Sequence, residues 1–198
     1  ERHAVSLTMI KIEQARKEQA ETIARLIMEA MNHACCQWFA GPGHTLQEFH
    51  RLMTRLVSHE ASQYSYRNTL VAVADNGEVI AACVSYDGAL LHRLRLPFIE
   101  GCLSAFNRDY SDMADETAAG ELYVDSLCVD RSFRGRGIAS RLLHATVEKG
   151  KAMNLPTGLL VDTGNPKAES LYRREGFVYL NDSEWGSHRM HHLQKPLA

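Results

Sequence analysis

Two arginines and two glycines, at residues 134–137, lie where a strand-like segment gives way to a helix-like one. Residues 122–129 alternate between two faces, and from Ile138 onward the apolar residues recur at helical spacing. The first N–H groups of a helix have no partner within it, and the helix dipole adds partial positive charge there. Glycines lack a Cβ, so an anion can approach their backbone, and arginines supply further donors and charge. The segment therefore predicts a site for a phosphate or pyrophosphate group.

Two common phosphate-binding motifs fit this sequence poorly. The chain has no Gly-x-x-x-x-Gly-Lys-Ser/Thr pattern, which argues against a P-loop nucleotide hydrolase. Residues 135–140 match half of the dinucleotide fingerprint, with Ser140 in place of its third glycine. That fingerprint normally opens a doubly wound sheet, but here only about 60 residues follow it. We therefore regard a dinucleotide-binding protein as the weakest of the functional hypotheses for this chain.

Two blocks of the sequence resemble one enzyme family. The pattern Arg-x-x-Gly-x-Ala at residues 134–139, directly after Leu-Cys-Val-Asp, resembles the acyl-CoA-binding motif of the GNAT N-acetyltransferase superfamily. Residues 165–177 resemble the family's later block, Asn-x-x-Ala-x-x-Leu-Tyr-x-x-x-Gly-Phe, with every position filled. The close resemblance covers roughly residues 121–180, and before that only the order of elements is similar.

The resemblance implies that acetyl-CoA is the cosubstrate, and the spacing of the His and Cys residues predicts no metal site. Family members hold the pantetheine arm and thioester with free backbone groups of a central strand that diverges from its neighbour. The positions here that match the family's cofactor-binding residues are Leu127, Cys128, Val129, Arg134, Gly135, Arg136, Gly137, Ala139, Ser140 and Asn165. By residue type, Asn165 is also a good helix N-cap, and the two roles are compatible.

The resemblance also implies a general acid. Tyr172 matches the family's tyrosine near the CoA sulfur. A phenol has an ordinary pKa near 10 and can donate a proton to a leaving thiolate. The alternative is a tyrosine that only packs its ring under the sheet.

The general base is open between two carboxylates. In the family, an acidic residue on the acceptor-facing side of the central strand often deprotonates the amine, directly or through water. Asp125 is the first candidate because it is nearer the expected thioester, and Glu121 is the second. Either could instead be a buried hydrogen-bonding residue. Strict alternation predicts two faces, one with Tyr123, Asp125, Leu127 and Val129 and the other with Leu122, Val124, Ser126 and Cys128.

The acceptor is expected to be a primary amine, which the sequence does not name further. Trp38, Phe39 and Phe49 are candidates for its pocket, although packing in the core or in a lid is the more common role for such residues. The stretch 109–121 carries five carboxylates and no Lys or Arg. A charge run is usually a solvated loop, but it could also form an acidic lip that attracts a cationic amine.

Composition narrows the classes of partner. The chain is 45% hydrophobic and 23% charged with a net charge of −2, which gives no overall attraction to nucleic acid. No apolar run approaches the length of a membrane span. Five cysteines without a Cys-x-x-Cys pair predict reduced thiols in a cytoplasmic protein. His188, His191 and His192 cluster, but their spacing fits no common metal site.

The hydrophobic pattern predicts one mixed α/β domain over residues 9–198, and the resemblance implies the GNAT acyl-CoA N-acyltransferase fold, a mostly antiparallel mixed sheet flanked by helices. We interpret residues 1–8 as a tag or a disordered leader and residues 88–120 as an insert before the central strand. Residues 32–44 and 182–188 are expected to be irregular, and Pro97 is expected to divide two short helices. Strands are expected at 9–15, 68–74, 78–86, 122–129, 158–162, 177–180 and 189–195, and helices at 16–31, 45–57, 138–150 and 165–175.

Taken with the resemblance, these features predict an enzyme that moves an acetyl group from acetyl-CoA to a primary amine of a small molecule or protein by direct attack in a ternary complex. The alternative is a CoA-binding sensor or interaction module that keeps the fold but has lost transfer. The presence of Tyr172 and Asn165 favours the enzyme. Dimerisation is common in the family, so a homodimer is compatible with the resemblance.

Overall fold

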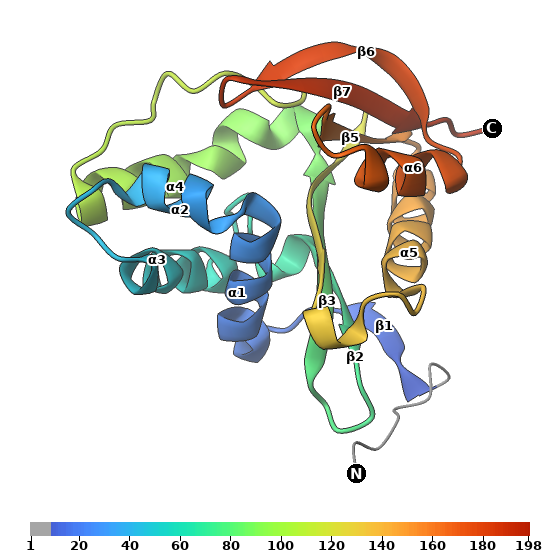
Figure 1. Cartoon of the computed structure of the whole chain (residues 1–198), viewed down its shortest axis with the longest axis horizontal. Helices are drawn as coiled ribbons and strands as arrows, with labels where there is room; N and C mark the ends of the chain where they lie inside the picture. Colours follow the sequence, from blue (N-terminus) through green and yellow to red (C-terminus); the bar gives the residue numbers. More distant parts are fainter. Residues whose placement is uncertain (1–8) are drawn as a thin grey trace.

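The computed structural model describes residues 9–198 and contains a seven-stranded sheet with helices on both faces (Figure 1). The leader predicted at residues 1–8 lies outside the described residues. The strands lie in the order β1-β2-β3-β4-β5-β7-β6, and β4 and β5 are parallel whereas the other neighbouring pairs are antiparallel. The strands are β1 (Lys11–Gln14), β2 (Thr69–Val73), β3 (Val79–Asp87), β4 (Leu122–Val129), β5 (Thr157–Asp162), β6 (Val178–Trp185) and β7 (His188–Lys195).

The helices divide between the two faces of the sheet (Figure 1). One face, which we call the α1–α4 face, carries α1 (Ala20–Met31), α2 (His33–Ala40), α3 (Leu46–Ser58) and α4 (Leu91–Phe106). The other, the α5–α6 face, carries α5 (Ile138–Ala152) and α6 (Pro166–Arg174). A separate cluster of buried apolar side chains lies on each face of the sheet. Residues 10–198 also contain four single-turn 3₁₀ helices: η2 (Lys17–Gln19), η3 (Tyr66–Asn68), η4 (Gly88–Leu90) and η5 (Arg131–Phe133).

The mixed α/β architecture and most predicted elements are confirmed. The β2–β3 hairpin turns at Asp75-Asn-Gly77, where Gly77 has φ of +85° and the Asn76 side chain accepts from the Glu78 N–H at 3.0 Å. A positive φ favours glycine, which is why this tripeptide is a reliable turn signal. Helix α3 begins with the expected capping box between Thr45 and Glu48.

One segment predicted to be irregular is a helix. Asn32, with φ of +68°, ends α1, and its side chain caps α2 by accepting from the Cys35 N–H at 2.8 Å. Helix α2 then buries a short stripe that includes Cys36 and Phe39. Two turns rich in Cys, His and aromatic residues have a weak helical propensity, so tertiary packing decides this helix.

The division predicted at Pro97 does not occur. Helix α4 runs unbroken from Leu91 to Phe106 with Pro97 inside it. Proline removes one backbone hydrogen bond from a helix, but Leu94, Phe98 and Cys102 bury one continuous face of α4. Packing of that face compensates for the missing hydrogen bond.

The loop predicted at residues 182–188 is mostly strand. Strand β6 extends to Trp185 and pairs with β7 around Gly186 and Ser187, whose φ values of +55° and +66° fit a tight hairpin turn. The sequence missed it because β6 is an exposed edge strand in which Asn181–Glu184 show no apolar alternation.

No helix within residues 9–198 is long and apolar enough to cross a membrane. The five cysteines, all within that range, are free thiols, as predicted.

Candidate active site

The central strand parts from its parallel neighbour halfway along its length. Strands β4 and β5 pair from Leu122 to Val124. Beyond Val124, β4 pairs with β3 alone among the described residues. The predicted divergence of the central strand is therefore present. Leu127, Cys128 and Val129 lie in the part of β4 that has no ladder partner on the β5 side.

A β-bulge in the middle of β4 overturns the predicted alternation. Val84 pairs with Ser126 and Ser85 pairs with Val124, so Asp125 is the extra residue. One extra residue exchanges the two faces for everything that follows. Cys128 therefore packs with Tyr123 on the α1–α4 face, whereas Leu127 and Val129 pack on the α5–α6 face with Val124.

The bulge is held from the α5–α6 face by a half-buried lysine. Lys149 of α5 donates to the Ser85 carbonyl at 2.8 Å and to the Ser85 hydroxyl at 2.9 Å. Burial lowers the pKa of Lys149. These bonds fix β3 at the register shift that gives Asp125 its position.

Asp125 turns toward a buried polar cluster on the α1–α4 face. Its Oδ2 accepts from the Tyr86 hydroxyl at 2.7 Å and from Gln63 Nε2 at 3.0 Å. The same hydroxyl lies 3.1 Å from Glu116 Oε1, and the same amide nitrogen lies 3.3 Å from it. Arg95 of α4 approaches the other oxygen of Glu116 at 3.6 Å. We call Gln63, Tyr86, Arg95, Glu116 and Asp125 the carboxyl cluster.

Burial sets the ionisation of this cluster. Glu116 is 9% exposed, and its pKa is raised well above the ordinary value, first by burial and then by the charge of Asp125. The Tyr86 phenol also has a raised pKa, chiefly because it is buried, so it stays a hydrogen-bond donor at neutral pH. In the sequence, Glu116 stands out only as part of an acidic run, and no local pattern marks Gln63, Tyr86 or Arg95 as site residues. One indirect signal was present, because Arg95 interrupts the apolar stripe of α4.

Glu121, the second candidate base, sits in a separate network on the same face. Its Oε1 lies 2.7 Å from His192 Nε2 and 3.2 Å from Gln194 Nε2, and its Oε2 accepts from the Thr117 hydroxyl at 2.7 Å. Burial acts to raise the pKa of Glu121, but the hydrogen bonds from His192 and Thr117 outweigh it and lower that pKa. A carboxylate with this many donors is well suited to a structural role.

The predicted phosphate site has the expected backbone shape. Gly135 and Gly137 have φ of +76° and +77°, and a Cβ at either would meet open space. Gly137 is the N-cap of α5, and within the described chain no side chain bonds to the free N–H groups of that first turn. The backbone around Gly137, Ala139 and Ser140 is therefore open to an anion.

The two arginines of the loop are positioned differently. Arg134 donates through Nε to the Val129 carbonyl at 3.0 Å, and its guanidinium lies 3.6 Å from Glu29 of α1. Arg136 instead lies over the Phe133 ring at 5.2 Å. Arg134 thus ties the loop to the end of β4, while Arg136 brings its charge close to the surface of η5.

Cys128 is not a nucleophile in this arrangement. Its thiol lies 3.6 Å from Glu29 Oε2, and its pKa is raised to about 11, mainly by burial. At neutral pH it is a neutral thiol, so only its backbone is a candidate for contact with a ligand.

Tyr172 and Asn165 lie on α6 and at its start. The pKa of the Tyr172 phenol is raised to about 12, mainly by burial, so it keeps its proton at neutral pH. Its ring packs edge-on to Phe177 with centroids 6.0 Å apart. Asn165 caps α6 by accepting from the Ala168 N–H at 3.2 Å. Tyr172 packs on the α5–α6 face and Asp125 contacts the α1–α4 face, so the two lie on opposite sides of the sheet.

Several other candidates lie outside this arrangement. Phe39 and Phe49 are buried in the core, whereas Trp38 is 59% exposed and stacks near Arg108. The three histidines near the C-terminus pair with three different carboxylates: His188 with Asp162, His191 with Glu169 and His192 with Glu121. Among residues 9–198 no group of three or more His, Cys, Asp or Glu is placed to hold a metal ion.

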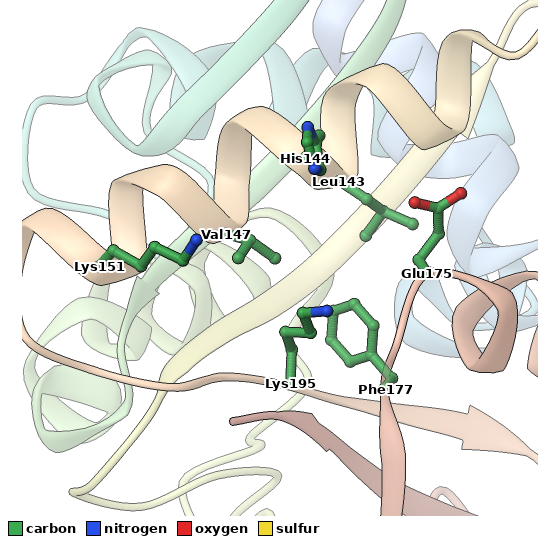
Figure 2. A pocket seen from close by; sticks show the side chains of 7 residues that line it. All are labelled: Leu143, His144, Val147, Lys151, Glu175, Phe177 and Lys195. Atoms are coloured by element: carbon green, nitrogen blue, oxygen red, sulfur yellow. The ribbon is translucent and has the colours of Figure 1, made fainter. Parts of the chain in front are cut away.

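A small pocket of about 80 Å³ lies between α5, the segment after α6 and the end of β7 (Figure 2), and none of the predicted site residues lines it. It is well below the roughly 300–1,000 Å³ of typical small-molecule sites. The pocket takes no part in the predicted site. Its lining residues are Leu143, His144, Val147, Lys151, Glu175, Phe177 and Lys195.

Comparison with known proteins adds an independent finding. Residues 32–177 match the model of the acetyltransferase (GNAT) family. Acetyltransferase Atu2258 of Agrobacterium fabrum is 40% identical over 66 residues, which is 33% of this chain and about half (47%) of that protein.

Two solved structures are similar over most of their length. An acetyltransferase crystal structure has a TM-score of 0.76 and 28% identity, covering 95% of this chain and 100% of the other. An N-acetyltransferase from Staphylococcus aureus Mu50 has a TM-score of 0.78 and 22% identity, covering 93% and 99%. At 22% identity, the likeness to the Staphylococcus aureus protein shows a shared fold and no more.

Proposed function

Because this chain belongs to the GNAT acetyltransferase family, we propose that it transfers an acetyl group from acetyl-CoA to a primary amine by direct attack in a ternary complex. The observation that carries the proposal is the arrangement around β4. The strand parts from β5 after Val124, and the open Gly135–Gly137 turn follows directly at the start of α5. An extended ligand with a pyrophosphate at one end fits a free strand edge followed by a helix start.

The residues toward this ligand have distinct roles in the proposal. The turn with Gly135 and Gly137, together with Ala139 and Ser140 in the first turn of α5, would hold the pyrophosphate through backbone N–H groups. Arg134 and Arg136 would supply charge. Backbone groups of Leu127, Cys128 and Val129 would bind the pantetheine arm, and Asn165 would border it while capping α6.

The chemistry needs a neutral amine, a polarised carbonyl and a protonated leaving group. The bound cosubstrate supplies the acetyl thioester. Asp125 would take the proton of the ammonium, directly or through one water. Backbone N–H groups of β4 would polarise the carbonyl, since fixed donors in a dry site stabilise developing charge. Tyr172, protonated because its pKa is about 12, would donate to the thiolate.

A cationic acceptor is supported by the acidic segment before β4. The structure divides the predicted lip, because Glu116 and Glu121 are buried while Asp109, Asp112 and Asp115 are exposed. Asp115 already lies 2.8 Å from His92 and 3.7 Å from Arg95, so it is mainly Asp109 and Asp112 that could attract a cation toward the α1–α4 face. We further propose a cytoplasmic location, supported by five free thiols, and a homodimer remains compatible with the family.

The test is release of free thiol from acetyl-CoA against a panel of amines, comparing wild type with Tyr172→Phe. We expect turnover with one amine class and a loss of about 10²-fold in kcat for the variant. Tyr179→Phe is the matched control, because it removes a phenol hydroxyl from the exposed strand β6. Its kcat should equal that of wild type.

Two other outcomes would redirect the proposal. Tight acetyl-CoA binding without turnover on any amine, or on a library of peptides and proteins, would favour the alternative of a CoA-binding sensor. Equal kcat for Tyr172→Phe and wild type would remove Tyr172 from the acid role while leaving acetyl transfer in place.

A further inference from the structure

Two carboxyl groups, one from the segment before β4 and one from β4 itself, share the same hydrogen-bond donors. The Tyr86 hydroxyl lies 2.7 Å from Asp125 Oδ2 and 3.1 Å from Glu116 Oε1. Gln63 Nε2 lies 3.0 Å from the first oxygen and 3.3 Å from the second. A phenol carries one proton and can donate it to only one acceptor at a time. The two carboxyls are therefore close together and compete for few donors.

The surroundings supply little positive charge to this pair. Arg95, 3.6 Å from Glu116 Oε2, makes the one salt bridge to either carboxyl within residues 9–198. That guanidinium also faces Asp115 at 3.7 Å and donates to two backbone carbonyls. One buried cation cannot neutralise both the buried carboxyl of Glu116 and the half-buried carboxyl of Asp125, and like charges this close disfavour double ionisation.

The other titratable groups around the pair are uncharged at neutral pH. Three buried tyrosines face it, one from each of three segments, and burial raises the pKa of each phenol well above its ordinary value. Cys35 of α2 interacts electrostatically with Tyr64, and the pKa of its thiol is also raised by burial. These tyrosines are Tyr64 before η3, Tyr86 of β3 and Tyr123 of β4.

We propose that Glu116 and Asp125 hold one proton between them, and that neutral Glu116 is a positioning residue that fixes Asp125 for the acceptor amine. This inference rests on the proposed acetyl transfer for its catalytic meaning. Tyr86 and Gln63 converge on Oδ2 of Asp125, while Oδ1 accepts from the Ser126 hydroxyl at 3.2 Å. Because Oδ2 is engaged in the cluster, Oδ1 is the oxygen left to face the amine.

Burial and charge agree with a proton on Glu116. Its pKa is raised mainly by burial and then by the negative charge of Asp125, against the opposing effect of Arg95. A protonated carboxyl adds a donor to a cluster that is short of donors. At alkaline pH the last proton would leave, and two adjacent carboxylates would repel each other and displace Asp125.

The kinetic test compares pH profiles of kcat and kcat/KM for wild type, Glu116→Gln and Glu116→Ala. The amide of Gln keeps the shape and a donor of the protonated carboxyl, so this variant should retain most of its turnover at neutral pH. We expect the kcat of wild type to fall at alkaline pH, where the last proton leaves the pair. Glu116→Gln should lack this fall. Glu116→Ala should lower kcat about tenfold or more, since it leaves Asp125 without that partner.

Glu100→Gln is the matched control, because it makes the same substitution at a carboxylate outside the proposed site. Glu100 is an exposed residue of α4. This variant should keep the alkaline fall in kcat. If Glu116→Gln is as impaired as Glu116→Ala at neutral pH, with an unchanged Tm, an ionised Glu116 is what the site uses and the proposal is wrong.

A second measurement needs no turnover. Carbon-13 NMR of labelled Asp and Glu carboxyl groups in the free protein should reveal one carboxyl that stays protonated past neutral pH and is lost in Glu116→Gln. The Asp125 signal should respond in the same step. If every carboxyl is ionised below neutral pH, the proposal fails even where acetyl transfer is established. If no amine is acetylated but this carboxyl is found, the shared proton stands and the proposed function fails.

Discussion

Asp125 occupies its position through a local irregularity of β4. It is the unpaired residue of the bulge opposite Val84 and Ser85, and its Oδ2 is held by Tyr86 and Gln63. A bulge re-aims one side chain and exchanges the faces of the residues that follow it on the same strand. The residue proposed as general base is therefore held rigidly, and its second oxygen lies at the edge of the buried cluster.

Replacing Asp125 by Asn should separate base catalysis from structure. Simple amines such as the lysine side chain have a pKa near 10.4, so at neutral pH the acceptor must lose a proton before it attacks. We expect Asp125→Asn to lower kcat/KM by about 10²-fold or more at low and neutral pH. Its rates should approach those of wild type at alkaline pH, where the amine is already neutral. Wild-type rates across the whole pH profile would refute the base role.

At the scale of elements, the candidate site depends on where β4 stops pairing with β5 and on how α5 begins. Strands β4 and β5 pair only as far as Val124 within the described chain, and α5 begins at an N-cap glycine without a side-chain cap. Both features leave backbone N–H groups unsatisfied. Unsatisfied N–H groups are costly in isolation but favourable toward an anionic or carbonyl-bearing ligand.

Gly137→Ala should test the proposed pyrophosphate site at this helix start. Gly137 has φ of +77°, so Ala should cost about 1–2 kcal/mol of stability and lower Tm by a few degrees. The new Cβ would occupy open space where the anion is expected to approach. The KM for acetyl-CoA should rise while kcat changes little.

Gly77→Ala is the control for strain. Gly77 has φ of +85° with open space around its Cβ position, and it lies in the β2–β3 hairpin. The control should lose similar stability with no change in the KM for acetyl-CoA. An equal KM effect in both variants would point to general destabilisation.

The segment between α4 and β4 should influence acceptor binding through charge. Asp112→Asn combined with Asp115→Asn removes two exposed carboxylates. If the acceptor is a polyamine-like cation, its KM should rise at low salt, and the difference should shrink at high salt because exposed charges are screened. Asp75→Asn in the hairpin is the control. A salt-independent effect, or none, would argue against an acidic lip.

At the scale of the whole molecule, a ligand of the folded state should raise thermal stability. Acetyl-CoA at 100 times its Kd should add about 2.7 kcal/mol. For a chain of 198 residues that corresponds to a rise in Tm of about 5–11 °C. NAD should give no shift, and it is the control for general nucleotide binding. A larger shift with NAD than with acetyl-CoA would favour the dinucleotide alternative.

The family, the mixed α/β class and the position of the two-glycine turn before α5 could all be predicted from the sequence. These depend on local rules, because the glycines, capping residues and hydrophobic periods act over a few neighbouring residues. Gly77, Gly137 and Asn165 were predicted to shape their turns and cap, and their backbone geometry agrees. Whether the residues of the turn bind acetyl-CoA stays a prediction.

The environment of the Asp125 and Glu116 carboxyl groups is set by tertiary contacts. The bulge at Asp125 depends on pairing with β3, and no period within β4 announces it. Gln63, 62 residues from Asp125 in the sequence, meets it only after the chain folds. Burial then raises the pKa of Glu116, whereas the sequence pattern predicts that Glu116 is one more surface charge. Long-range contacts and desolvation arise from packing, and local sequence carries little information about them.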